Sequence, residues 1–181
     1  EMKGTYPKII KDVRYGDEAQ KLIDDGKKLL DKIISDKSLT AKVVAGIFPA
    51  FSSNESVFTE GIEFQFPRQL VNKGKDIPQY SLSDFVAPKD DFIGIFAITT
   101  GHGLKTLVDK FENQNDDYNA IMVKVLADRL AEALAERMHE RVRKEFWAYA
   151  GNEVLKNEEL IKEKYQGIRP APGYPACPDH S

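Results

Sequence analysis

Two carboxylates and a histidine on one expected helix are the residues with the clearest capacity for chemistry. Asp128, Glu132 and His139 are spaced so that an α-helix places all three within one narrow stripe. Carboxylates on an otherwise apolar helix are costly unless they are paired, so Asp128 and Glu132 are candidates for a functional site. In the alternative, structural interpretation, Asp128 pairs with Arg129 or Lys124, and Glu132 pairs with Arg129 or with the neighbours of Glu136. The residues alone leave both interpretations open.

The C-terminal stretch is equally unusual, because four of the nine prolines of the chain lie between Arg169 and His180. We call residues 169–180 the strap. Each proline fixes φ near −65° and removes a backbone N–H group, and the residue before it is driven out of the helical region. The strap is therefore expected to be extended and stiff, with carbonyl groups that need partners elsewhere. It can serve as a ligand-holding backbone, which loses little entropy on binding, or as a tail that crosses the surface.

Two further motifs are weaker. Cys177 and His180 have the spacing of half a metal site, but a structural zinc site needs four ligands and the chain has no second cysteine. Residues 101–103, Gly-His-Gly, separate an expected strand from an expected helix, as a phosphate-binding turn would. The dinucleotide fingerprint requires a third glycine where this chain has Thr106, so glycines that ease a tight turn are the favoured interpretation.

The composition describes an ordinary soluble globular domain. Of the 181 residues, 41% are hydrophobic and 30% charged, and the net charge of −3 argues against nucleic acid as the main partner. A single cysteine fits a reducing compartment, so the expected location is the cytoplasm. No apolar run is long enough to span a membrane, and no signal-peptide pattern is present. The ends at Glu1 and Ser181 suggest a fragment of a longer chain.

The first half of the chain is expected to contain a helix followed by a hairpin. Apolar residues recur at helical spacing between residues 17 and 35, which predicts an amphipathic helix. Residues 42–48 are β-rich and predict an interior strand, and residues 61–66 alternate, which places Ile62, Phe64 and Phe66 on the core face. We expect these two strands to pair directly across a polar turn at residues 52–56. Residues 68–79 fit either a helix fragment or a loop.

The second half is expected to be mainly helical. Residues 92–99 form the most hydrophobic run and predict a central strand buried on both faces. Helices are predicted at residues 104–113, 118–149 and 158–164, with residues 121–135 buried nearly all round and Gly167 ending the last helix. On these grounds the chain is one α+β domain, a binding module that carries a rigid strap.

The strap also carries a resemblance to a known family. Residues 167–180, Gly-Ile-Arg-Pro-Ala-Pro-Gly-Tyr-Pro-Ala-Cys-Pro-Asp-His, resemble the signature of the activation domain of cobalamin-dependent methionine synthase. The likeness covers nearly the whole chain, through residues 157–161, 139–143, 126–133, 116–124, 84–88 and 46–50. It implies that residues 1–181 form a single C-shaped α+β domain with a twisted antiparallel sheet and flanking helices, one of them long.

The resemblance also implies a function in methionine biosynthesis. Domains of this family bind S-adenosylmethionine and support the reductive methylation of cob(II)alamin, which regenerates methylcobalamin. The implied partners are the cobalamin-binding domain of the same polypeptide and a flavodoxin-type reductant. Cobalamin and zinc belong to the full-length methyltransferase and are not expected in this fragment, which should supply no catalytic residue. Two rival functions are a docking module that binds no ligand and an oxidoreductase that binds a dinucleotide at residues 101–103.

Four strap residues correspond to ligand contacts of the family. Arg169 is expected to contact the methionine carboxylate of the ligand, an interaction well suited to a guanidinium. Ala171 and Gly173 would offer backbone groups, and Gly173 would allow close approach because it has no side chain. Tyr174 would pack beside the ligand.

Three acidic residues complete the set that the resemblance implies. Glu132 and Glu163 correspond to residues near the sulfonium and amino end of the ligand, where negative charge favours a cation. Asp128 corresponds to a position that faces the cobalamin-binding domain. The family's site also uses an aspartate before the segment that matches residues 4–7 and a tyrosine-containing stretch after the strap. Neither lies in this sequence, so we expect a domain truncated at both ends.

Overall fold

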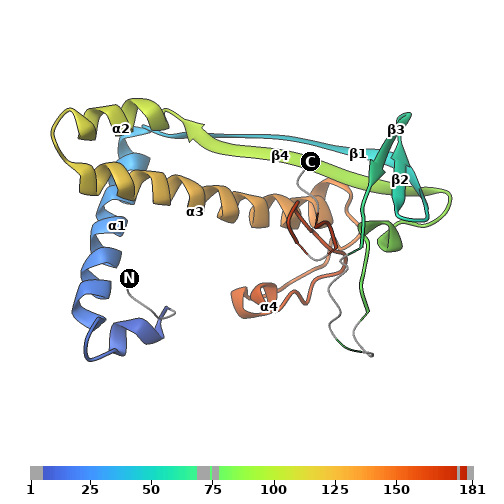
Figure 1. The fold of residues 1–181 in the computed structure, drawn as a ribbon, viewed down its shortest axis with the longest axis horizontal. Coiled ribbons are helices and arrows are strands. Elements are labelled where there is room, and N and C mark those ends of the chain that lie inside the picture. Colours follow the sequence, from blue (N-terminus) through green and yellow to red (C-terminus); the bar gives the residue numbers. More distant parts are fainter. Residues whose placement is uncertain (1–5, 69–73, 75–77, 175, 179–181) are drawn as a thin grey trace. The chain divides into compact units, whose positions relative to one another are not determined.

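The computed structural model describes residues 6–68, 74, 78–174 and 176–178. The chain divides into two compact units. The first consists of residues 1–43 and 98–135, and the second of residues 44–97 and 136–181. Among the described residues, the four strands follow one another along the chain, interrupted only by a short 3-10 turn, with α-helices before and after them, as in an α+β fold. Strands β1 (Thr40–Ser53) and β4 (Asp91–His102) and helix α3 (Asp117–Arg141) each run from one unit into the other (Figure 1).

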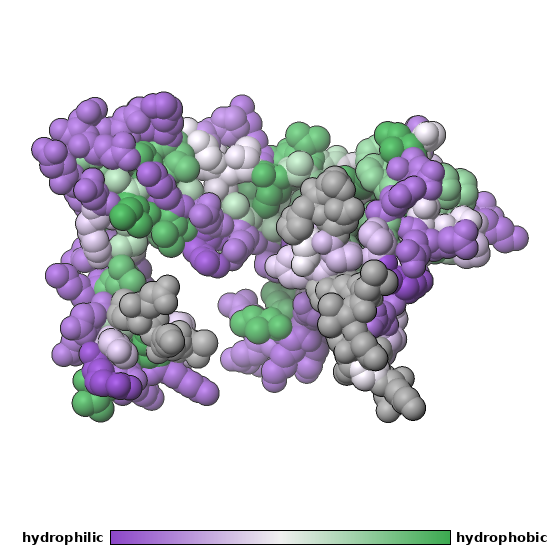
Figure 2. Space-filling view, viewed as in Figure 1, coloured by the Kyte–Doolittle hydropathy of each residue, from purple (hydrophilic) through white to green (hydrophobic). Residues whose placement is uncertain are grey.

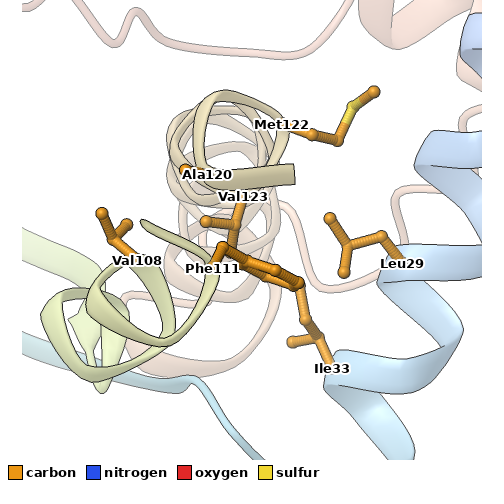
Figure 3. Packing of buried hydrophobic residues seen from close by; sticks show 7 residues of the cluster. All are labelled: Leu29, Ile33, Val108, Phe111, Ala120, Met122 and Val123. Carbon is orange, nitrogen blue, oxygen red and sulfur yellow. The ribbon is translucent and has the colours of Figure 1, made fainter. Parts of the chain in front are cut away.

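The first unit is built on three helices, and their bounds follow the sequence periodicity closely. They are α1 (Gly16–Asp36), α2 (Leu104–Glu112) and the N-terminal part of α3 (Asp117–Arg141). Together they bury one apolar cluster that consists of Leu29, Ile33, Val108, Phe111, Ala120, Met122 and Val123 (Figure 3). The outer surface of α1 is mainly hydrophilic in Figure 2, as expected for a helix with one buried face.

The second unit contains most of a four-stranded sheet whose strands lie in the order β3-β2-β1-β4. Its strands are β1 (Thr40–Ser53), β2 (Ser56–Thr59), β3 (Ile62–Gln65) and β4 (Asp91–His102). β1 pairs with β2 and β2 with β3, both antiparallel. The small core against the sheet consists of Ala50, Val57 and Val86, with Phe66 and Ile93 packed on it.

The predicted hairpin is wrong in its pairing. Residues 42–48 belong to β1, but the partner of β1 is β2, which begins at Ser56 inside the segment that we expected to be a turn. β3 pairs with β2 instead and is not paired with β1. Ile62, predicted on the core face, is 55% exposed because β3 lies at the edge of the sheet.

The most hydrophobic strand is also misplaced by the sequence interpretation. β4 is an edge strand beside β1, not a central one, and its side chains Phe92 and Ile95 are exposed. Hydrophobic side chains are visible along the sheet in Figure 2. One face of β4 is covered near Gly94, where Trp147 and Val142 of the chain lie within van der Waals distance of the position of a Cβ atom.

The predicted long helix is confirmed, although it ends slightly earlier and is more exposed than predicted. α3 ends at Arg141 and continues as one π-helical turn, η3 (Val142–Phe146), after which the chain turns at Ala148 with a positive φ of 61°. Ile121 and Val125 are exposed, so the stretch that we expected to be buried nearly all round has an open face. The last helix, α4 (Asn157–Ile161), ends six residues before Gly167.

Candidate functional site

The described part of the strap contains a tight turn closed by its own backbone hydrogen bonds, so the prediction of an extended strap is wrong over these residues. The Tyr174 N–H group donates to the Ala171 carbonyl (3.1 Å), and the Gly173 and Cys177 N–H groups donate to the carbonyls of Cys177 (2.8 Å) and Tyr174 (2.9 Å). Gly173 has a φ of 91°, a region in which residues with a Cβ atom are strained. This explains the glycine between two prolines, and part of the predicted need for carbonyl partners is met within the strap.

A 3-10 turn, η2 (Leu82–Phe85), anchors the strap. The Leu82 N–H group donates to the Ala176 carbonyl at 2.8 Å. η2 is itself held by two fully buried hydroxyls, because Ser81 Oγ and Ser83 Oγ share a hydrogen bond (2.7 Å) and Ser83 donates to the Asn54 carbonyl (2.8 Å). Hydroxyls buried in this way stabilise a structure only while every partner is present.

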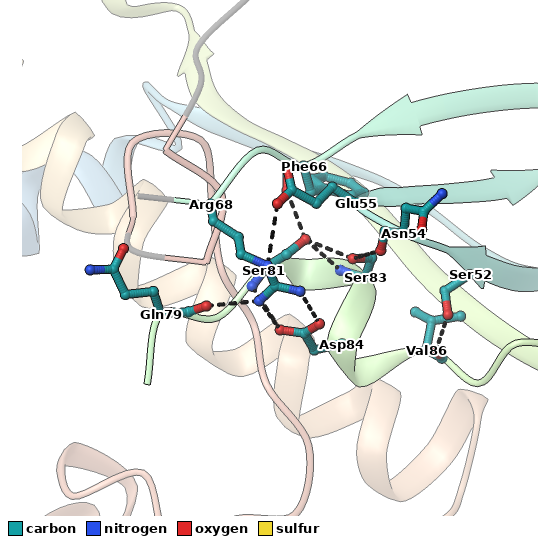
Figure 4. Close-up of polar contacts among 10 residues, drawn as sticks. All are labelled: Ser52, Asn54, Glu55, Phe66, Arg68, Gln79, Ser81, Ser83, Asp84 and Val86. Atoms are coloured by element: carbon teal, nitrogen blue, oxygen red, sulfur yellow. Dashed lines mark hydrogen bonds and ion pairs between the residues drawn. The ribbon is translucent and has the colours of Figure 1, made fainter. Parts of the chain in front are cut away.

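A bidentate ion pair closes the outer side of η2 (Figure 4). Arg68 Nη1 and Nη2 each lie 2.5 Å from an oxygen of Asp84, and Nη1 also donates to the Gln79 carbonyl (2.7 Å). The Asp84 carboxylate accepts from the Ser81 N–H group as well (3.0 Å). Hydrogen bonds from Arg68 are the main reason why the pKa of Asp84 lies below its usual value.

Arg169, at the start of the strap, forms an ion pair with Glu136 of α3. The Nη2 atom of Arg169 contacts Oε1 of Glu136. The arginine side chain is only 25% exposed and its Nε atom is buried without a hydrogen-bond partner among the described residues. A buried donor without a partner is expensive, so this edge of the guanidinium is suited to an acceptor from a ligand or from water.

Behind this pair lies a buried cluster of charged and aromatic side chains. Arg143 is 1% exposed and its guanidinium binds both oxygens of Glu153, the shortest contact being 2.6 Å. Arg143 also lies 4.4 Å from the centre of the Tyr165 ring, and His139 meets that ring edge-on with 4.9 Å between centroids. Burial first, and then the charges of Arg143 and Arg169, lower the pKa of His139 to about 4, although Glu153 opposes the shift. His139 is therefore neutral at pH 7, and its Nδ1 atom is buried without a partner among the described residues.

The two helical carboxylates are not buried. Glu132 is exposed and forms an ion pair with Arg129 at 2.7 Å, which confirms the structural alternative for this residue. Asp128 is exposed too, and the pairing suggested for it is wrong, because Arg129 pairs with Glu132 and Lys124 lies 3.5 Å from Glu112. The expected cost of burying these carboxylates therefore does not arise. Only His139 of the predicted stripe is buried, because Tyr165 covers it.

The residues that the resemblance implied fall into both units. Those in the second unit are Arg169, Ala171, Gly173, Tyr174 and Glu163, and those in the first are Asp128 and Glu132. Glu163 lies near the cluster of Arg169 and Tyr165: after burial, its charge is the largest influence that raises the pKa of the Tyr165 hydroxyl, followed by that of Glu136. Glu163 is exposed and has a φ of 52°. Tyr174 is 61% exposed, so its ring is available to a ligand.

A separate cavity of about 410 Å³ lies in the first unit beside the Gly-His-Gly turn. Its lining residues are Leu29, Lys32, Ile33, Asp36, Ser38, Gly103, Thr106, Leu107, Lys110 and Phe111. At Gly103, φ is 93° and a Cβ atom would collide with the Ser38 carbonyl oxygen. The glycine is thus required by the turn itself, as the simpler interpretation of this motif predicted.

Reasoning from the sequence overlooked Glu136, Tyr165 and Glu153 as partners of the strap region. Glu136, His139 and Arg143 share one face of the helix at spacings of three and four residues, and this spacing was a usable signal. Their partners lie between 10 and 33 residues away in sequence, at Glu153 and Arg169. Only the tertiary structure identifies them.

The described residues contain no group of three His, Cys, Asp or Glu side chains that could hold a metal ion. His180, which with Cys177 has the spacing of half a metal site, lies outside those residues, and Cys177 is half-buried. In the same part of the chain, no helix has the length and apolar character needed to cross a bilayer.

Comparison with known proteins identifies the family to which this architecture belongs. The family model described as "Vitamin B12 dependent methionine synthase, activation domain" matches residues 1–181. A solved structure, the crystal structure of the MetH reactivation domain bound to AdoHcy, is 50% identical in sequence and superimposes with a TM-score of 0.88. The match covers 99% of this chain and 58% of that one, so this chain spans somewhat more than half of its relative. The chain belongs to the family of vitamin B12-dependent methionine synthase activation domains.

Proposed function

We propose that this chain binds S-adenosylmethionine along the strap and, within a cobalamin-dependent methionine synthase, supports the reductive methylation of cob(II)alamin to methylcobalamin. The observation that carries the proposal is the match, at 50% identity and a TM-score of 0.88, to a domain crystallised with S-adenosylhomocysteine, the product that remains when the methyl group leaves. Its partners would be the cobalamin-binding domain of the same polypeptide and a flavodoxin-type reductant.

The strap has the features that such a ligand requires. Arg169 presents a guanidinium edge whose Nε atom has no acceptor among the described residues, and a ligand carboxylate would supply one. Gly173 is exposed and lets a ligand approach the backbone closely, with Ala171 and the exposed Tyr174 beside it. The hydrogen bonds within the strap fix these groups before binding, which reduces the entropy lost on association.

The acidic residues would complement the positive charges of the ligand. Glu163, which lies close to the Tyr165 hydroxyl and has an exposed carboxylate, would attract the sulfonium and amino groups. Glu132 belongs to the first unit, and its role stays the prediction of the resemblance alone. Asp128, also exposed, would face the cobalamin-binding domain. In this role the chain holds and orients a methyl donor, so its residues need to bind and exclude water but not to exchange protons.

Calorimetric titration with S-adenosylhomocysteine tests the proposal, on a chain extended at both ends so that it includes the two segments that the family's site also uses. We expect binding, and we expect Arg169→Ala to weaken it by roughly tenfold or more, because hydrogen bonds to charged groups contribute about 1.5–3 kcal/mol. The control is Arg137→Ala, which removes an arginine of α3 that, among the described residues, pairs with Glu140. No heat of binding from the unmodified chain would contradict the assignment.

The same titration addresses the docking module that binds no ligand. The exposed Ile121 and Val125 on α3 are the observation in favour of a docking role. If docking is the whole function, the chain takes up no S-adenosylhomocysteine but still protects the cobalamin-binding domain from hydrogen exchange.

A further inference from the structure

We propose that Glu136 determines the specificity of the strap site: with Arg169 it forms a paired carboxylate and guanidinium that recognise the zwitterionic amino-acid end of the ligand. The guanidinium would bind the α-carboxylate, and Glu136 would accept a hydrogen bond from the α-ammonium group, which Glu163 attracts through its charge alone. This inference rests on the proposed function and adds a residue and a ligand feature to it.

The geometry of the pair leaves both partners incompletely bonded. Glu136 contacts Arg169 through Oε1 only, and the described residues provide no partner for its Oε2 atom. Arg169 uses only Nη2 in the contact, and its Nε atom is buried without a partner in the same part of the structure. Opposite charges held side by side, each with spare hydrogen-bonding capacity, match a molecule that carries an ammonium and a carboxylate on one carbon atom.

The surroundings hold this pair in place. Glu136 and His139 lie one helical turn apart, and His139 packs on Tyr165, which in turn lies over the buried Arg143. Arg143 is fixed by Glu153, so the buried charge behind the pair is itself paired. His139 is neutral at pH 7 and therefore adds no third charge beside Arg169 and Glu136. A rigid support of this kind is what an orienting ion pair needs.

The two side chains of the pair also differ in exposure. The side chain of Glu136 is 54% exposed and that of Arg169 25% exposed. A structural ion pair at the surface contributes little to stability, so stability alone does not explain why a half-buried arginine is held by this carboxylate. Ligand recognition explains the pair. A lone arginine would bind any carboxylate, whereas the pair requires an α-amino acid.

The test compares two ligands on the same extended chain. One is S-adenosylhomocysteine, and the other is its desamino analogue, in which 4-mercaptobutanoate replaces homocysteine. We expect the unmodified chain to prefer S-adenosylhomocysteine by roughly tenfold or more, since the analogue leaves Glu136 without an ammonium partner. We expect Glu136→Gln to remove most of this preference, and Arg169→Ala to weaken both ligands. The control Glu140→Gln removes a carboxylate of the same helix that pairs with Arg137 and Lys144, and it should leave the preference unchanged.

A second readout separates recognition from general damage. If Glu136 acts together with Arg169, the effect of Glu136→Gln on the affinity for S-adenosylhomocysteine should shrink in the Arg169→Ala background. An unmodified chain that binds both ligands equally overturns the inference without any substitution and leaves the proposed function intact. A Glu136→Gln variant that keeps the full preference overturns it too. An unmodified chain that binds neither ligand contradicts the proposed function, and the inference falls with it.

Discussion

The two units bury different kinds of side chain. The first unit is stabilised by an apolar cluster in which Leu29 and Ile33 of α1 meet Phe111 and Val123 of the other helices. The second unit has a small apolar core and buries charge and hydroxyl groups in addition, Arg143 and Ser81 among them. Apolar packing tolerates local change, whereas a buried polar network needs every partner. The residues that we assign to ligand binding around Arg169 lie in the unit that depends on polar networks.

The largest expected effect comes from breaking the buried ion pair of the second unit. Glu153→Ala leaves the Arg143 guanidinium buried without its carboxylate, which typically costs about 3–5 kcal/mol. Chemical denaturation measures the loss. The double replacement Arg143→Met with Glu153→Leu is the control, because exchanging both charges for apolar groups is often neutral. A loss as large for the double variant would show that packing, not the uncompensated charge, is responsible.

The next effect probes the apolar core of the first unit. Ile33 is 4% exposed within that cluster, and Ile33→Ala is expected to lower the free energy of unfolding by about 2–5 kcal/mol through lost burial and a residual cavity. Chemical denaturation gives the free energy of unfolding of this variant. Ile34→Ala is the control, because Ile34 is 64% exposed on the same helix. Equal losses for the two variants would contradict the assignment of the core.

The pH dependence of stability should report His139 of the second unit. Its pKa in the folded chain, about 4, lies below the ordinary value of 6.5, so protonation favours the unfolded chain. The contribution of His139 is complete above pH 6.5 and is lost as the pH falls towards 4. Between pH 6.5 and 5 the loss is roughly 2 kcal/mol, at about 1.4 kcal/mol per pH unit. Denaturation of the unmodified chain and of His139→Gln at pH 6.5 and at pH 5 measures this loss. If both proteins lose the same free energy of unfolding between the two pH values, His139 is not responsible.

The smallest effect is expected at an exposed ion pair of the first unit. Lys105 contacts Asp109 at 2.6 Å, one turn apart on α2, and the lysine side chain is 87% exposed. Although the contact with Asp109 raises the pKa of Lys105, water and salt screen such pairs. Lys105→Gln should leave the denaturation midpoint unchanged within error. A clear shift would mean that surface electrostatics contribute to the first unit more than its apolar cluster suggests.

Where the sequence interpretation succeeded, the signal was local. The bounds of α1 and α2 were predicted almost to the residue, because a helix with one buried face repeats its apolar residues every three or four positions. The special role of Gly103 and the conformational restriction of the strap also follow from single residue types. The strap motif carried the family resemblance as well, and the match of the whole chain confirms it.

Where it failed, the missing information was the position of an element among its neighbours. A run such as residues 92–99 reads as a buried strand, yet β4 lies at the edge of the sheet. In the same way, Ile121 and Val125 of α3 are apolar but exposed. Hydrophobicity records a tendency to be buried and does not say which partner covers a residue, or whether one in the same chain does so.

For the candidate site, the sequence by itself determined the strap: its prolines, Arg169 and the glycine at position 173 set a stiff backbone with one cation at its start. Only the tertiary structure decided what surrounds that cation. Glu136 lies 33 residues before Arg169, and Tyr165 contacts both His139 and Arg143. A side chain's type fixes which contacts it can make, but the path of the chain fixes which partner comes within reach.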